Sequence, residues 1–160
     1  MRKITYIIIS CLFVSFGTGL TSCNEQDYKL FDSSRTGIYF TEDSVVYSFG
    51  VTKLEVTSHE MELPVKIMGA PVKEERSFKV EVVTDKTTAK AGEHYIMPTE
   101  LIIKADSVNG VLPVTVLRED LGSDTYWQVA FRLVSTDDFE PENEILTVAI
   151  ASFNNIVEPP

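Results

Sequence analysis

The chain has 160 residues, with 24 acidic and 14 basic side chains and a formal net charge of −10 at pH 7. Such a charge repels nucleic acid and anionic lipid, so polyanion-binding classes are excluded, while a neutral glycan or a basic protein stays compatible. The two cysteines are Cys11 and Cys23, and the two histidines are His59 and His94. Residues 24–160 therefore contain no thiol, which excludes disulfides, thiolate metal sites and multi-histidine centres there.

The N-terminus has the pattern of a bacterial secretory signal. A basic start and an apolar run from Ile4 to Phe16 precede Leu20-Thr21-Ser22-Cys23. The run is shorter than the ~20 residues of a membrane-spanning helix, and no basic stop-transfer flank follows it. We predict a signal peptide over residues 1–22 that ends in a lipobox, with Cys23 as the lipid-modified residue. Its acyl chains would anchor the protein to a membrane.

Residues 23–36 are polar and predict a flexible, lipid-anchored tether. Loss of the leader, with Arg2 and Lys3, lowers the net charge to −12. Glu25 and Asp27 lie close to Cys23, and this resembles the acidic signal by which many Bacteroidetes lipoproteins reach the outer face of the outer membrane. The resemblance implies an outer-membrane protein that faces the cell exterior; the alternative is a merely solvated linker.

From Gly37 onward, apolar residues alternate with polar ones, as in half-buried antiparallel strands. Seven or eight strands are expected, and together they predict a single immunoglobulin-like β-sandwich over residues 37–158. Pro64 and Pro113 interrupt two of these patterns, so those strands are expected to be edges or to carry bulges. The predicted strands are Ile38–Phe40, Val45–Phe49, Met61–Met68, Phe78–Val82, Leu101–Ile103, Leu112–Val116, Trp127–Leu133 and Leu146–Ile150.

The segment Thr88–Tyr95, followed by Leu101–Ile103 and Leu112–Val116, resembles the middle of Calx-beta-type sandwiches. The chain also resembles an uncharacterised family of Bacteroidetes lipoproteins that are often encoded beside SusC/SusD-like glycan-uptake genes. That resemblance implies a Calx-beta-like sandwich and SusC/SusD-like partners. Besides the lipobox, the residues that carry it are Ile38-Tyr39-Phe40, Ser48-Phe49, Pro64 to Gly69, Arg76, Ala91 to Tyr95 and Asp138-Phe139.

Glu93-His94 is the pair that most suggests catalysis, because a histidine beside a carboxylate can act as a general base. Adjacent strand residues point to opposite faces, however, and no serine in a nucleophile-elbow context accompanies them. We therefore predict a structural corner, in which Gly92 supplies a permissive backbone and Tyr95 packs into the core or ties the corner with its hydroxyl. The sequence predicts no enzyme and no cofactor.

Two other groups of residues suggest ligands. The acidic loop Asp137, Asp138, Glu140, Glu142 and Glu144 is either a calcium site or simply a solvated loop. Trp127 shares its face with apolar neighbours, so we expect it in the core and not in a sugar site. Tyr126 and Tyr39 are the candidate ligand contacts, since they lie near strand ends or on opposite faces.

These observations favour a surface-exposed lipoprotein with a non-catalytic accessory role in outer-membrane glycan capture. The role would be glycan binding or support of a SusC/SusD-like complex, and the glycan context rests on the family resemblance. The alternative is a structural or adhesin-type subunit that acts through β-strand-mediated contacts with another protein.

Overall fold

The structure is a computed structural model that describes residues 36–118, 121, 125–141 and 146–156. The chain divides into two units, Met1–Asp32 and Ser33–Pro160. The predicted signal peptide, Cys23 and all but the last residue of the predicted tether lie outside the described residues. All the described residues belong to the second unit.

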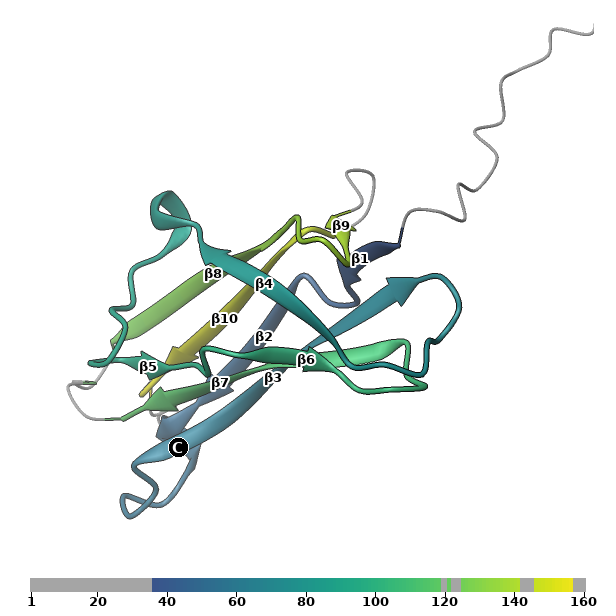
Figure 1. The fold of residues 1–160 in the computed structure, drawn as a ribbon. Helices are drawn as coiled ribbons and strands as arrows, with labels where there is room; N and C mark the ends of the chain where they lie inside the picture. The colour runs from purple at the N-terminus through teal and green to yellow at the C-terminus, as the bar shows by residue number, and fades with distance from the viewer. Residues whose placement is uncertain (1–35, 119–120, 122–124, 142–145, 157–160) are drawn as a thin grey trace, which may run out of the picture. The chain divides into compact units, whose positions relative to one another are not determined.

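The described residues form ten strands and two short 3-10 turns (Figure 1). All eight predicted strands are present, and two further strands of two residues each, β5 (Tyr95–Ile96) and β9 (Glu140–Pro141), bring the number to ten. In chain order the elements are β1 (Gly37–Phe40), β2 (Ser44–Ser48), η1 (Phe49–Val51), β3 (Ser58–Met68), β4 (Arg76–Val82), η2 (Thr84–Lys86), β5 (Tyr95–Ile96), β6 (Leu101–Ile103), β7 (Asn109–Leu117), β8 (Tyr126–Val134), β9 (Glu140–Pro141) and β10 (Val148–Asn154).

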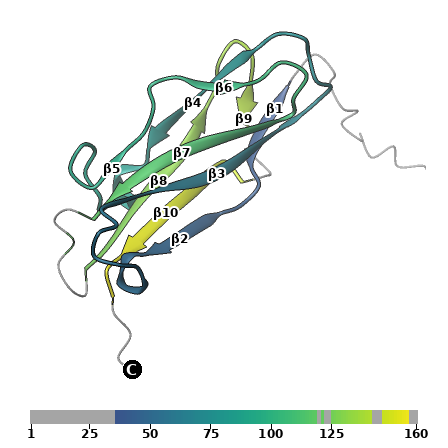
Figure 2. The same ribbon diagram turned by 90° about the horizontal axis from the view of Figure 1, so that it is seen from below.

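The strands form two five-stranded sheets, in the orders β5-β7-β3-β1-β9 and β2-β10-β8-β4-β6. Most neighbours are antiparallel, as in β3 and β7, which pair without a break from Ser58 opposite Leu117 to Lys66 opposite Asn109. The chain changes sheets between β1 and β2, which are separated by residues 41–43 only (Figure 2). Because of this change, β2 runs parallel to the last strand, β10. The predicted β-sandwich class is confirmed.

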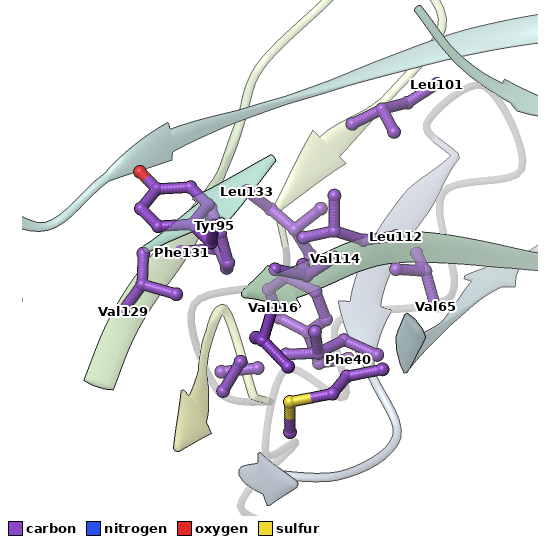
Figure 3. Packing of buried hydrophobic residues seen from close by; sticks show 14 of the residues in the cluster. Phe40, Val65, Tyr95, Leu101, Leu112, Val114, Val116, Val129, Phe131 and Leu133 are labelled. Carbon is purple, nitrogen blue, oxygen red and sulfur yellow. The ribbon is translucent and has the colours of Figure 1, made fainter. Parts of the chain in front are cut away.

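The core lies between the two sheets, where alternate residues of the strands face one another. Figure 3 shows Leu112 and Val114 from the first sheet close to Leu133 from the second. All three side chains are at most 3% exposed. The period of two seen in the sequence is therefore the signature of this single shared core.

The two prolines do not mark edge strands, because β3 and β7 both lie inside their sheet and their register has no bulge. Each proline instead lies where its neighbouring strand has already ended. Thr41 N donates to the Pro64 carbonyl at 3.0 Å, so the missing N–H of Pro64 faces the side of β1, beyond its last residue. Pro113 faces the side of β5, which pairs only with Thr115 and Val116. The prediction that these two strands are edges or carry bulges was wrong. The rule behind it holds at each proline, because neither residue lies where a strand partner needs its N–H.

Candidate functional site

The segment 89–95 forms the predicted corner. Gly92 has a φ of +80°, a backbone conformation that a side chain disfavours. Its N–H donates to the Tyr95 carbonyl at 2.8 Å, and Lys90 N donates to His94 Nδ1 at 3.0 Å. The Leu117 N–H donates to the His94 carbonyl at 2.9 Å, which fixes the corner to the end of β7. The corner is thus held by backbone hydrogen bonds on both sides of Gly92.

The side chains of Glu93 and His94 engage different partners. His94 is 5% exposed, and its ring stacks on Trp127 with 4.0 Å between the ring centroids. The Glu93 carboxylate is exposed and lies 3.1 Å from Lys90 Nζ. The imidazole therefore belongs to the packing of the corner, as expected.

Tyr95 packs into the core below this corner, which confirms one of its two predicted roles. It is 3% exposed, and its ring meets Phe131 edge to face with the centroids 6.0 Å apart. Burial raises the pKa of the Tyr95 hydroxyl above its ordinary value, because the phenolate would lose its hydration.

Trp127 is a core residue, as predicted. It is partly buried and packs against the main cluster from the inner face of β8. Its Nε1 is buried without a hydrogen-bond partner in the part of the chain that the structure describes. The indole thus has its apolar surface engaged with His94 and the core, and is not a stacking surface for a ligand.

The acidic loop is described only in part, since Glu142 and Glu144 lie outside the described residues. Asp137 and Asp138 are exposed, whereas the neighbouring Phe139 is buried beneath the Arg76 guanidinium, 4.9 Å from the ring centroid. Within the described ranges, no group of three or more histidine, cysteine, aspartate or glutamate side chains is placed to hold a metal ion. The described part of the loop thus packs through Phe139, while Asp137 and Asp138 face solvent.

Tyr126 stands on the outer face of the second sheet, at the start of β8. Its side chain is 49% exposed. The hydroxyl donates to Ser152 Oγ at 2.8 Å, and the same oxygen lies 3.4 Å from Gln128 Oε1. The hydrogen bond of its hydroxyl group therefore holds the half-exposed ring of Tyr126 in one orientation.

The neighbours of Tyr126 extend a row of hydroxyl and amide groups across three strands. Asn154 lies opposite Tyr126 in the pairing of β8 with β10, and Ser152 lies opposite Gln128. Ser48 of β2 donates from Oγ to Asn154 Oδ1 at 2.7 Å. We call Tyr126, Gln128, Ser152, Asn154 and Ser48 the Tyr126 platform. It offers one aromatic face beside uncharged donors and acceptors, while Ser152, which is 3% exposed, holds the Tyr126 hydroxyl from below.

Tyr39 does not belong to this platform. It lies on β1, in the other sheet, opposite Lys66, and points outward because Ile38 and Phe40 on either side are buried in the core. The structure therefore places the two predicted contact tyrosines on different sheets. Ser48, Gln128, Ser152 and Asn154 were not predicted. A longer last strand would have revealed two of them, since β10 extends to Asn154 and not only to Ile150.

A family model described as a domain of unknown function, DUF4843, matches residues 23–160. The chain belongs to this family. No curated protein matches it significantly. The described residues include no helix with the length and apolar character needed to cross a membrane.

Solved structures share the fold at low sequence identity. A candidate carbohydrate-binding protein from Bacteroides ovatus has a TM-score of 0.56 and 12% identity, over 76% of this chain and 38% of that one. EndoBT-3987 from Bacteroides thetaiotamicron, solved with a Man5GlcNAc product, has a TM-score of 0.56 and 11% identity, over 73% of this chain and 30% of that one. A Calx-beta structure, CBD12 from CALX1.2, has a TM-score of 0.51 and 14% identity, over 73% and 43%. The chain thus spans less than half the length of each of these proteins.

Proposed function

We propose that this chain is a non-catalytic glycan-binding lipoprotein, accessory to glycan capture at the outer membrane, and that the Tyr126 platform is its binding surface. The observation that carries the proposal is the half-exposed ring of Tyr126, fixed by Ser152 and surrounded by amide and hydroxyl groups. Sugars combine apolar faces with many hydroxyls, so they suit an aromatic face beside uncharged hydrogen-bonding groups. The likeness to a candidate carbohydrate-binding protein supports a glycan-related role.

The charge of the molecule defines the class of glycan. All five residues of the platform are uncharged, and the chain as a whole carries a net charge of −10. An acidic polysaccharide would meet repulsion at long range, whereas a neutral one would meet none. The expected ligands are therefore neutral glycans.

The anchor in this proposal rests on the N-terminal sequence, and the partner rests on the resemblance to lipoproteins encoded beside SusC/SusD-like genes. The lipobox ends at Cys23, and the match to the family model begins at the same residue, which supports a mature chain that starts there. In this proposal, acyl chains on Cys23 hold the domain at the outer face of the outer membrane. There it would deliver glycan to SusC/SusD-like proteins.

Affinity gel electrophoresis of the full chain in detergent tests the platform against a panel of neutral and acidic polysaccharides, with calcium and with a chelator. Retardation by a neutral glycan is expected, and Tyr126→Ala should weaken it at least about tenfold, or about 1.4 kcal/mol. Tyr39→Ala is the matched control, because it removes a tyrosine from the other sheet. Equal loss in both variants, or retention in Tyr126→Ala, would contradict the assignment. Binding only with calcium would point to the acidic loop instead.

A structural or adhesin-type subunit is the second candidate function. It is favoured by one observation, the edge of β2, which among the described residues has a strand partner on one side only. Such an edge can accept a strand from another protein without any special motif.

A further inference from the structure

In the part of the chain that the structure describes, no strand pairs with the outer edge of β2. The Ile150 N–H donates to the Asp43 carbonyl at 2.9 Å, and Ile150 lies opposite Ser44 in the parallel pairing. In a parallel ladder this pattern directs the amides and carbonyls of Val45 and Tyr47 toward β10. The backbone groups of Ser44, Val46 and Ser48 therefore point away from the sheet.

Natural sheets usually protect such edges with charges, prolines, bulges or very short strands. The other edge strands of the described residues follow this rule, since β5, β6 and β9 have two, three and two residues. β2 has five residues, the sequence Ser-Val-Val-Tyr-Ser, and an unbroken register with β10. It contains no charge, proline or bulge. Val46, at its centre, is 66% exposed.

We propose that β2 is a self-association site, at which a second copy of this chain adds its own β2 in the antiparallel direction, with Val46 on the two-fold axis. Val46 then lies opposite its own counterpart, and Ser44 lies opposite Ser48. All three are residues whose backbone groups face outward, so each pair exchanges two hydrogen bonds. The two exposed valine side chains cover one another on the outer face.

The charges at the two ends of β2 fit this arrangement. Glu42 and Asp43 precede the strand. At its other end the Arg118 guanidinium lies 5.7 Å from the Phe49 ring centroid and donates to the Lys53 carbonyl at 2.8 Å. Antiparallel pairing about Val46 places Asp43 opposite Phe49 of the other copy. The acidic end of each strand therefore meets the Arg118 end of its partner, twice in one dimer.

The arrangement is closed, because a two-fold contact uses the same surface of both copies and leaves no free β2 edge. The sheet β2-β10-β8-β4-β6 continues across the axis into that of the second copy, and the Tyr126 platforms lie on its outer face. Self-association of this kind rests on the backbone and charges of β2, and Ser48 is the one platform residue that lies on this strand.

Sedimentation equilibrium of the full chain in density-matched detergent, over a range of protein concentrations, tests for this dimer. The wild-type chain should reach twice its monomer mass. Val46→Lys brings two cations together on the axis and should raise the dissociation constant at least about tenfold, or about 1.4 kcal/mol. Asp43→Lys, which opposes Arg118, should raise it as well, and salt should weaken the wild-type dimer.

Two further variants keep the test decisive. Val46→Pro removes an N–H that points away from β10, so it should leave the fold intact by circular dichroism and still abolish the dimer. Val111→Lys, an exposed valine on the outer face of the other sheet, should dimerise like the wild type. A wild-type chain that stays monomeric at every concentration would overturn the proposal. So would a Val111→Lys variant that dissociates as fully as Val46→Lys.

Discussion

His94 and Tyr95 are consecutive residues that are both buried, whereas neighbouring side chains of a straight strand point to opposite faces. The backbone turns at Gly92, and His94 packs against Trp127 while Tyr95 enters the core against Phe131. The corner thus converts two adjacent residues into two separate core contacts. The same turn separates the carboxylate of Glu93 from the imidazole of His94, although the two residues are adjacent in sequence.

The buried hydroxyl of Tyr95 makes stability depend on alkaline pH. Its pKa is raised above 10.0 in the folded state, so at high pH the folded chain keeps a proton that the unfolded chain has lost. This contribution is fully present below about pH 10 and is lost as the pH rises through the raised pKa. Tyr95→Phe keeps the ring and should lose less stability than the wild type between neutral pH and about pH 11.

Urea unfolding at the two pH values measures this difference. Val111→Ala is the control, because it changes an exposed side chain without an ionisable group, and it should follow the wild type. An identical alkaline loss in the wild type and Tyr95→Phe would show that burial of the Tyr95 hydroxyl does not set the dependence.

Features within one segment could be predicted from the sequence, but contacts between side chains on neighbouring strands could not. The turn at Gly92 and the burial of Tyr95 follow from residues within one segment. The contact of Tyr126 with Ser152 joins positions 26 residues apart and depends on the register of β8 with β10. The sequence specifies the faces of each strand but not which strand lies beside it, so it indicates Tyr126 without its partners.

At the scale of elements, the two prolines show how a strand can contain a residue without a donor. β3 has a neighbour on both sides, but β1 ends at Phe40, and Pro64 comes directly before Val65, the residue that pairs with Phe40. Proline at this position also restricts the unfolded chain. A proline is thus compatible with an internal strand when its missing N–H lies on the side where the neighbouring strand has already ended.

Two variants of β3 separate these effects. Pro64→Ala should preserve the circular dichroism spectrum and lower the free energy of unfolding by about 0.5–1 kcal/mol, because the unfolded chain gains freedom. Val65→Pro moves the missing N–H to the side of β7, where Val65 lies opposite Gly110. It should prevent folding or destabilise the domain far more than Pro64→Ala does, because it removes a ladder hydrogen bond inside the sheet. A Val65→Pro chain as stable as Pro64→Ala would contradict this orientation of the β3 backbone.

The elements themselves were largely predictable, since a period of two is a property of each strand alone. The exceptions have physical reasons. β5 and β9 have two residues each, too few for any period. The parallel pairing of β2 with β10 follows from the change of sheet after β1, which depends on the packing of the two sheets and leaves no mark in either strand.

For the molecule as a whole, the two sheets share one core, so neither can be stable alone. Phe131 lies at its centre, with no exposed surface, and contacts the first sheet through Tyr95. Removing its ring leaves a cavity that both sheets line. The free energy of unfolding of native domains is only about 5–15 kcal/mol, so the cost of a single cavity is a large fraction of it.

Phe131→Ala should lower the free energy of unfolding by about 3–5 kcal/mol. Two probes should report one transition in this variant and in the wild type. These are the fluorescence of Trp127, the single tryptophan, and circular dichroism of all the strands. Val111→Ala, on the outer face, should cost far less. Separate transitions for the two probes would mean that the sheets unfold independently.

The parallel pairing of β2 with β10 also defines how the domain responds to mechanical load. Because the two strands run in the same direction, the start of β2 and the end of β10 lie at opposite ends of one ladder. A pull on these two points loads the hydrogen bonds in shear, so they must break together, whereas an antiparallel hairpin pulled at its open end would lose them one at a time. The domain is thus built to resist stretching between the start of β2 and the end of β10.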